Sequence, residues 1–194
     1  MINSNLITTA ILTSSLIFSN MTFADENTQP IKHWNIGGGL YALAFEGDNY
    51  RGNKHIGNNL SGYTLSSTYA ISDSFAINGK YYSVDHNIVS RFMDSAGVEI
   101  TALYGTGLAT KGFKAYFAGG LYRENFKALE DSSFIAQKGS VSGVQFGGGI
   151  GYNWEAVSLD YSVFMRSTAD YDDYKYLGDD VSAVSGALVL AFRF

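Results

Sequence analysis

Alternation of large apolar residues with small or polar residues runs through most of this chain, and no other feature constrains the fold as strongly. The last eight residues, ALVLAFRF, show the pattern, with Leu188, Leu190, Phe192 and Phe194 at every second position. A period of two residues places successive side chains on opposite faces of a β-strand. Helical spacing is hard to find after residue 33. The pattern therefore predicts an all-β protein.

Eight segments carry this alternation, and each is ten to fourteen residues long. They are 34–46, 59–71, 75–87, 97–109, 113–125, 142–153, 157–167 and 183–194. An ordinary strand has about 5–6 residues, whereas a tilted strand that crosses a bilayer needs about 9–11. The single proline, Pro30, precedes all eight segments, so no proline interrupts them. The lengths predict strands that span a membrane.

The connections between these segments alternate between short and long. Three are short turns, at 72–74, 110–112 and 153–156, and four are long and charged, at 47–58, 88–96, 126–141 and 168–182. This order is typical of an antiparallel up-and-down barrel, in which all short turns share one end. In outer-membrane barrels the short turns face the periplasm and the long loops face the outside. An even number of strands places both ends of the barrel chain at the short-turn end.

The two faces of the predicted strands differ in charge. In segment 142–153, Val144, Phe146 and Ile150 take one face, while glycines, Gln145 and Asn153 take the other. A water-soluble barrel would turn its apolar face inward and its charges outward. A face without any charge suits lipid, and a mixed face suits a crowded interior in which polar groups pair. The chain is therefore predicted to form a transmembrane barrel with a polar interior.

Segment 34–46 is the exception, because its large apolar residues lie on both parities. Ile36 and Leu40 share one parity, whereas Tyr41, Leu43 and Phe45 share the other, which predicts a β-bulge or a wrong assignment of faces.

Aromatic residues also gather near the short-turn end, where they would form a girdle at the headgroup level. They are Trp34, Tyr69, Phe75, Phe113, Tyr152, Trp154, Phe192 and Phe194.

The N-terminus is a separate unit. Residues 6–18, LITTAILTSSLIF, form an apolar and hydroxyl-rich stretch that is too short for a mature membrane-spanning helix. Small residues, Thr22 and Ala24, stand where a signal peptidase cuts. We therefore expect a cleaved signal peptide at 1–24, a short periplasmic segment at 25–33 and an outer-membrane barrel at 34–194.

Charged residues on the interior parity are expected to pair, because an unpaired charge in a barrel interior is costly. Arg193 and Asp160 lie on adjacent predicted strands near the short-turn end. They are predicted to pair, or to join a network with other interior ions. These are Lys80, Glu99, Lys114 and Arg166. Eight strands leave an interior about wide enough for side chains alone, which favours a plug over a path for ions.

Several classes of function receive no support. The chain has no cysteine, and His33, His55 and His86 share no metal-ligand spacing. The net charge of −5, without a basic stripe, argues against nucleic-acid binding. The glycines of 146–151 lie within a strand pattern and precede no helix, so they predict no dinucleotide site. We therefore expect no metal, no cofactor and no catalysis.

The connection at 168–182 is the best candidate for a surface contact. It interleaves tyrosines with an acidic run, and tyrosine supplies rigid amphipathic contact area. The candidate contact residues are Tyr171, Asp172, Asp173, Tyr174 and Tyr176. They are predicted to meet an extracellular ligand, although a merely solvated loop is the simpler interpretation.

Three passages resemble those of a known superfamily of small eight-stranded outer-membrane barrels. They are YAISDSFAINGKYY (69–82), GGGIGYNW followed by VSLDYSVF (147–164), and the ending AFRF. The superfamily includes opacity-type porin-family proteins, the OmpA transmembrane domain and the OmpX/Ail group. The resemblance implies insertion by the outer-membrane assembly machinery, aided by periplasmic chaperones, with a C-terminal signal in Phe194, Phe192 and Leu190. It also implies contact with outer-membrane lipids and lipopolysaccharide.

The expected function is an integral outer-membrane protein that displays four surface loops and performs no catalysis. A narrow channel for ions or small solutes is the alternative. A lipid-modifying outer-membrane enzyme and a soluble ligand-binding barrel are the remaining readings. The catalytic His/Ser pairs of the lipid A deacylase and palmitoyltransferase barrels have no counterpart in this sequence.

Overall fold

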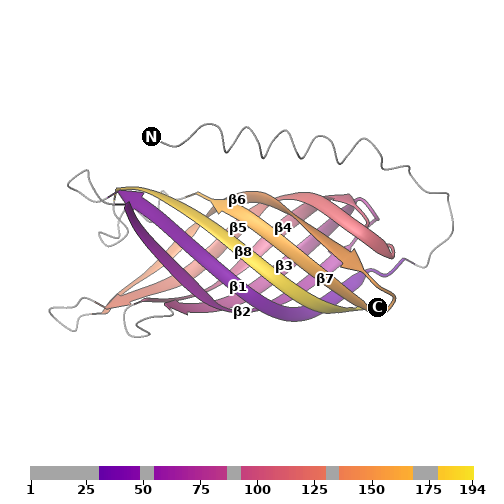
Figure 1. Ribbon diagram of the computed structural model, residues 1–194, viewed down its shortest axis with the longest axis horizontal. Helices are drawn as coiled ribbons and strands as arrows, with labels where there is room; N and C mark the ends of the chain where they lie inside the picture. Colours follow the sequence, from indigo (N-terminus) through magenta and orange to yellow (C-terminus); the bar gives the residue numbers. More distant parts are fainter. Residues whose placement is uncertain (1–30, 49–54, 87–92, 130–135, 168–178) are drawn as a thin grey trace.

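The structure is a closed antiparallel β-barrel, seen in a computed structural model that describes residues 31–48, 55–86, 93–129, 136–167 and 179–194 (Figure 1). The strands are β1 (Trp34–Asp48), β2 (His55–Ala70), β3 (Phe75–His86), β4 (Met93–Thr106), β5 (Gly112–Leu129), β6 (Ala136–Asn153), β7 (Val157–Arg166) and β8 (Asp179–Arg193). Each strand pairs with its neighbours in sequence, and β8 pairs with β1. The predicted eight-stranded up-and-down barrel is confirmed. Among the described residues, no helix is long and apolar enough to span a bilayer.

Six strands run further than predicted, always toward the long connections. The longest are β5 and β6, with 18 residues each, whose pairing continues to Leu129 and Ala136. Much of the predicted loop 126–141 is therefore strand. The sequence pattern ended too early because polar side chains break the apolar alternation, whereas the backbone ladder continues without it. The β5–β6 hairpin consequently extends beyond its neighbours.

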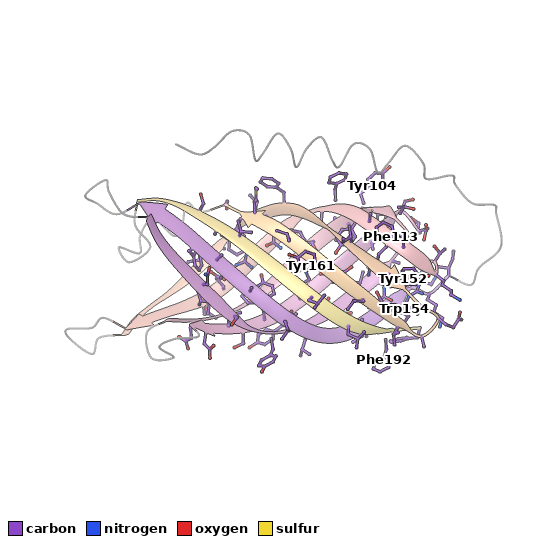
Figure 2. The ribbon with its side chains drawn as sticks, in the orientation of Figure 1. Tyr104, Phe113, Tyr152, Trp154, Tyr161 and Phe192 are labelled. Carbon is purple, nitrogen blue, oxygen red and sulfur yellow. The ribbon has the colours of Figure 1, made fainter. Side chains whose placement is uncertain are left out.

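The outer surface is apolar around the barrel, as the alternation predicted. Figure 2 shows side chains such as Tyr104 and Phe192 among those that project away from the barrel wall, where they are exposed. All eight residues of the predicted aromatic girdle are exposed, between 37% and 70%. Most of this girdle lies at the end that carries the C-terminus, as the labelled Phe113, Trp154 and Phe192 illustrate. The barrel thus exposes apolar groups of the kind that a water-soluble protein buries.

Strand β1 contains no bulge in its apolar part, so the bulge, one of the two predicted alternatives, was wrong; its one register shift, against β8, lies further on, between Glu46 and Asp48. Its pairing with β2 runs without a register shift from Trp34 to Asp48. Ile36 and Leu40 face outward, while Tyr41, Leu43 and Phe45 are buried inside. The interior near the long-connection end is therefore filled by large side chains from β1, which is why both parities of this strand are apolar.

The turn between β4 and β5 also differs from the prediction. The sequence pattern continued a strand to residue 109 with Leu108 facing lipid, but β4 ends at Thr106. Gly107 has a φ of 71°, and the chain after it folds inward across the short-turn end. Leu108 and Ala109 are buried inside the barrel as a result. Residues 107–111 are called the inward turn below.

Candidate functional site: the polar interior

The polar interior is built in layers, and the layer nearest the long connections centres on one arginine. Arg166 on β7 pairs with Glu99 on β4, with Nη2 and Oε1 2.5 Å apart, and with Glu124 on β5, with Nη1 and Oε2 3.0 Å apart. All three side chains are essentially without solvent exposure. One guanidinium therefore bridges two carboxylates across the barrel, which suits its planar fork of donors.

Three tyrosines complete this layer. The guanidinium carbon of Arg166 lies close to three ring centroids, at 5.9 Å from that of Tyr41, 5.1 Å from that of Tyr82 and 4.5 Å from that of Tyr122. The hydroxyl of Tyr41 donates to Glu99, and that of Tyr82 donates to Glu124. Tyr41 and Tyr82 are also stacked, with ring centroids 4.3 Å apart. These six side chains, called the arginine layer below, form a closed cross-section of ions and rings.

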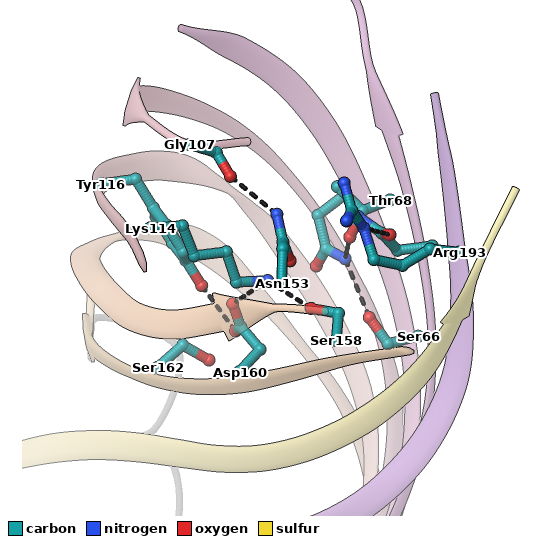
Figure 3. Close-up of polar contacts among 12 residues, drawn as sticks. Ser66, Thr68, Gly107, Lys114, Tyr116, Asn153, Ser158, Asp160, Ser162 and Arg193 are labelled. Atoms are coloured by element: carbon teal, nitrogen blue, oxygen red, sulfur yellow. Dashed lines mark hydrogen bonds and ion pairs between the residues drawn. The ribbon is translucent and has the colours of Figure 1, made fainter. Parts of the chain in front are cut away.

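Residues on β5 and β7 form a second group of ions nearer the short-turn end (Figure 3). Lys114 Nζ lies 2.8 Å from Asp160 Oδ2 and donates to Ser158 over 2.9 Å. The Tyr116 hydroxyl donates to Asp160 Oδ1 over 2.7 Å. Asp160 thus joins an interior network through Lys114, which was one of the two predicted outcomes.

Lys80 on β3 projects into the same region. Its Nζ donates to the Ser162 hydroxyl over 3.0 Å and lies 5.0 Å from the centroid of the Phe164 ring. Lys80 stands directly across from Glu99 in the β3–β4 register, but the Glu99 carboxylate turns toward Arg166. Lys80 therefore belongs to the group of Lys114 and Asp160, and Arg166 belongs to the arginine layer.

The predicted pair of Arg193 with Asp160 does not form. The β7–β8 register places Val189, not Arg193, opposite Asp160. Arg193 points instead into the short-turn end, where it donates to four oxygens: Ala109 O at 2.8 Å, Trp154 O at 2.7 Å, Thr110 O at 3.2 Å and Asn35 Oδ1 at 3.3 Å. The prediction was wrong because Arg193 meets turn carbonyls before it reaches a carboxylate.

Other side chains hold the same inward turn. Asn153 Nδ2 donates to the carbonyl oxygens of Gly107 and Thr110, at 2.7 and 3.0 Å. Asp73, in the β2–β3 turn, accepts from the backbone N–H groups of Gly107, Ala109 and Thr110 over 3.0–3.1 Å. The inward turn is thus fastened from several strands and closes the short-turn end.

The Asp73 carboxylate is electrostatically adapted to this role. Burial by itself raises its pKa, but the hydrogen bonds from the Thr110 hydroxyl and from the three N–H groups outweigh burial. The net effect holds the pKa of Asp73 below its usual value of 3.8. Asp73 therefore stays ionised in its contact with the turn across the neutral pH range.

A small polar cavity lies between the arginine layer and the inward turn. Its volume is about 20 Å³, and Lys80, Lys114, Asp160 and Tyr116 are among its lining residues. A water molecule needs about 10–15 Å³, so the cavity has room for one or two particles of that size. Leu108 of the inward turn and Phe164 also line it. We call this space the lysine cavity.

Sequence reasoning missed Glu124, Asp73 and Asn153 as parts of the site. Glu124 continues the interior parity of Lys114, Tyr116 and Tyr122, so the alternation alone contained the signal. Asp73 gave no such signal, since its role depends on a turn from another hairpin. No group of three or more potential metal ligands occurs within the described part of the chain.

The remaining predicted residues lie elsewhere. Leu190, Phe192 and Phe194 are exposed on the outer surface. Ser83 and Asp85 are exposed as well, and the side chain of His86 is outside the described residues. The surface-contact candidates Tyr171, Asp172, Asp173, Tyr174 and Tyr176 also fall outside them, as does the predicted signal peptide.

The comparisons with known proteins support the fold through structure alone. No family model matches the sequence, and no curated protein matches it. The attachment invasion locus protein Ail of Yersinia pestis is 17% identical, with a TM-score of 0.59 over 85% of this chain and 100% of its own. Neisserial surface protein A is 14% identical, with a TM-score of 0.56 over 82% of this chain and 97% of its own.

The N-terminal β-barrel domain of OprF from Pseudomonas aeruginosa is a third similar structure. It is 16% identical, with a TM-score of 0.53 over 82% of this chain and 99% of that domain. This chain therefore has the fold of the small eight-stranded outer-membrane barrels, as its sequence motifs predicted.

Proposed function

We propose that this chain is an integral protein of the bacterial outer membrane, whose closed barrel holds four surface segments and catalyses no reaction. The observation that carries the proposal is the inversion of polarity across the barrel wall. Large apolar side chains cover the outside, while seven charged side chains project inward from the strands: Lys80, Glu99, Lys114, Glu124, Asp160, Arg166 and Arg193. Such an arrangement fits hydrocarbon outside and a self-paired polar interior.

Closure of the strand ring supports the same location. Every strand has a partner on both sides, because β1 pairs with β8. A barrel without an edge satisfies its backbone N–H and C=O groups internally, which a bilayer requires. The girdle of exposed Trp, Tyr and Phe at the short-turn end fits the headgroup level of one leaflet.

A scaffold function is favoured over a channel by the filling of the interior. The arginine layer blocks the barrel on one side of the lysine cavity, and the inward turn with Arg193 blocks it on the other. An ion crossing the barrel would have to displace both. The polar lysine cavity between them is the one observation that favours a narrow channel as a second candidate.

Partners are proposed from position and from charge. Arg123 is exposed on β5, in the half of the strand nearer the long connections. Its guanidinium suits the phosphates of lipopolysaccharide. The assembly machinery and periplasmic chaperones are proposed to recognise the last strand through Leu190, Phe192 and Phe194. The tyrosine-rich segment with Tyr171, Tyr174 and Tyr176 is proposed to contact an extracellular ligand.

The similar structures favour a role at the cell surface. Two of them carry surface functions in their names, attachment and invasion for Ail and surface protein for the neisserial barrel. Ail has also been seen with the heparin analogue sucrose octasulfate. We infer a comparable role in surface contact for this chain, with a ligand of its own.

Fractionation together with heat-modifiable migration tests the location. The folded barrel is expected in the detergent-dependent outer-membrane fraction and to migrate faster on a gel before boiling than after it. Recovery in a soluble fraction without detergent would overturn the proposal and favour the soluble ligand-binding barrel.

Conductance measurements test the scaffold against the channel. Purified barrel in a planar bilayer is expected to give no regular openings. Stepwise openings that change on Arg166→Ser would establish the channel instead.

Two further experiments test the absence of catalysis and the surface contact. Unchanged lipid A mass spectra on overexpression are expected, since no catalysis is proposed. Deletion of 170–180 is expected to abolish any surface-binding phenotype while leaving heat-modifiable migration intact.

A further inference from the structure

The lysine cavity has an unusual excess of hydrogen-bond donors. Lys80 has three N–H donors, and within the described residues it spends one on the Ser162 hydroxyl. Lys114 spends two of its three, on Ser158 and on Asp160. Both lysines line the cavity and both are buried. Two ammonium groups thus retain donors in one small enclosed space.

The hydroxyl groups around the cavity add to this excess. Ser66 and Thr68 each accept from the amide nitrogen of Asn78, at 2.9 and 2.8 Å, and Ser158 accepts from Lys114. A hydroxyl that accepts from nitrogen keeps its own hydrogen to donate. All three residues line the cavity, so their hydrogens can turn into it. Figure 3 labels Ser66, Thr68 and Ser158.

The carboxylate of the cavity is already engaged. Asp160 accepts from Lys114 at one oxygen and from Tyr116 at the other. Among the lining residues there are two cations and this one anion, which leaves one positive charge without a carboxylate partner in contact. Glu99 attracts Lys80 from across the strand pair, but the Oε1 atom of Glu99 is bound to Arg166 in the next layer and Lys80 donates to Ser162 instead. A buried charge of this kind is costly unless it is paired.

We propose that the lysine cavity binds one monatomic halide ion, with chloride as the physiological ligand. A halide accepts hydrogen bonds from several directions and donates none, so it matches a lining rich in donors. Its single negative charge would lie between the two ammonium groups. Its size is close to that of water, which the volume of about 20 Å³ admits. Phosphate and sulfate are too large for the same space.

The ion has a structural consequence for the barrel. It would bridge Lys80 on β3 to Lys114 on β5 across the interior, in a part of the barrel where no carboxylate of the described residues connects these two strands. A ligand that binds the folded state alone stabilises that state in proportion to the logarithm of its concentration once the site is saturated. Halide binding therefore adds to barrel stability without requiring conduction, and it is independent of the proposed surface function.

Bromide locates the ion directly. Crystals of the mature barrel, refolded and grown with sodium bromide, are expected to give one anomalous bromine peak within hydrogen-bonding distance of Lys80 Nζ and Lys114 Nζ. A cavity that holds only water, with no anomalous peak, would overturn the proposal. This measurement uses the native chain, so it stands even if a variant fails to fold.

Anion-dependent unfolding gives the second test. The barrel is refolded in detergent micelles with chloride, bromide, gluconate or sulfate at equal ionic strength, and its thermal midpoint is measured. The midpoint is expected to rise with chloride and bromide concentration as a binding site fills, whereas gluconate and sulfate are expected to show only the general effect of salts excluded from the protein surface. Equal midpoints in all four anions at every concentration would contradict halide binding.

Matched lysine variants assign the effect to the cavity. Lys80→Met is expected to abolish the halide-specific rise, whereas Lys111→Met, in the exposed part of the inward turn, is expected to retain it. Thr68→Val removes one donor and keeps the shape, so it is expected to weaken the halide dependence. Retention of the full dependence in both Lys80→Met and Thr68→Val would sink the proposed site.

Discussion

Trp34 and Phe194 close the barrel by exchanging two backbone hydrogen bonds. The Trp34 N–H donates to the Phe194 carbonyl over 2.9 Å, and the Phe194 N–H donates to the Trp34 carbonyl over 3.0 Å. Their side chains are both exposed on the apolar outer surface. The first residue of β1 and the residue after β8 therefore form the last rung of the seam at the short-turn end.

Deleting Phe194 is expected to impair formation of the barrel. Both hydrogen bonds of this last rung are lost, each worth about 0.5–1.5 kcal/mol, together with the aromatic ring that is proposed to guide assembly. The heat-modifiable fraction in outer membranes measures the effect. Phe194→Ala keeps the backbone bonds, so it separates the seam from the ring. Normal assembly of the deletion variant would contradict both roles.

Arg166→Met is expected to destabilise the barrel by about 3–5 kcal/mol, because Glu99 and Glu124 are left buried without their cation. Urea unfolding in lipid vesicles, followed by the fluorescence of the two tryptophans, measures the change. The triple variant Arg166→Met, Glu99→Gln and Glu124→Gln is expected to recover part of the loss. No recovery would mean that packing, and not charge, holds this layer.

Coupling between interior ions is expected to follow the observed pairs. Lys114→Met and Asp160→Asn should show an interaction energy of about 0.5–3 kcal/mol in a double-mutant cycle, since the two groups are in contact. Arg193→Met and Asp160→Asn should instead be additive, because Arg193 binds turn carbonyls. Unfolding free energies of the single and double variants decide between the two pairings.

Acid is expected to loosen the inward turn through Asp73. Since the folded protein holds the pKa of Asp73 below the usual 3.8, its ionised form stabilises the fold above that value. This contribution is lost as the pH falls through the folded pKa. Asp73→Asn should therefore lower the thermal midpoint at neutral pH and differ little from the native barrel well below pH 3.8. Asp85→Asn, on the exposed outer face, serves as the control.

Glycines on the two faces are expected to respond differently to alanine. A Cβ added at the inward-facing Gly39 would overlap the carbonyl oxygen of Leu188 on β8, whereas a Cβ added at the outward-facing Gly79 would lie 4.0 Å from the carbonyl oxygen of Glu99. Gly39→Ala should therefore reduce the folded fraction and Gly79→Ala should leave it unchanged. Equal effects of the two substitutions on heat-modifiable migration would show that the close approach of β1 to β8 at Gly39 is not needed.

Most of the architecture could be predicted from the sequence because it depends on local pattern. Alternation tells which residues share a face, and it placed Gln145 and Asn153 inside and Leu190 and Phe192 outside. Connection lengths gave the strand order. In β1 the alternation was ambiguous, because large apolar side chains such as Tyr41 and Phe45 fill the interior while others face outward.

By itself, the sequence determined the number of strands, the face of almost every side chain and the need for the interior charges to pair. Only the tertiary structure decided which charges meet. The partner of Asp160 is Lys114 and not Arg193, because pairing depends on the stagger between strands and on how far each long side chain reaches. The inward turn was equally hidden, since Asp73, Asn153 and Arg193 come together on it only after the barrel closes.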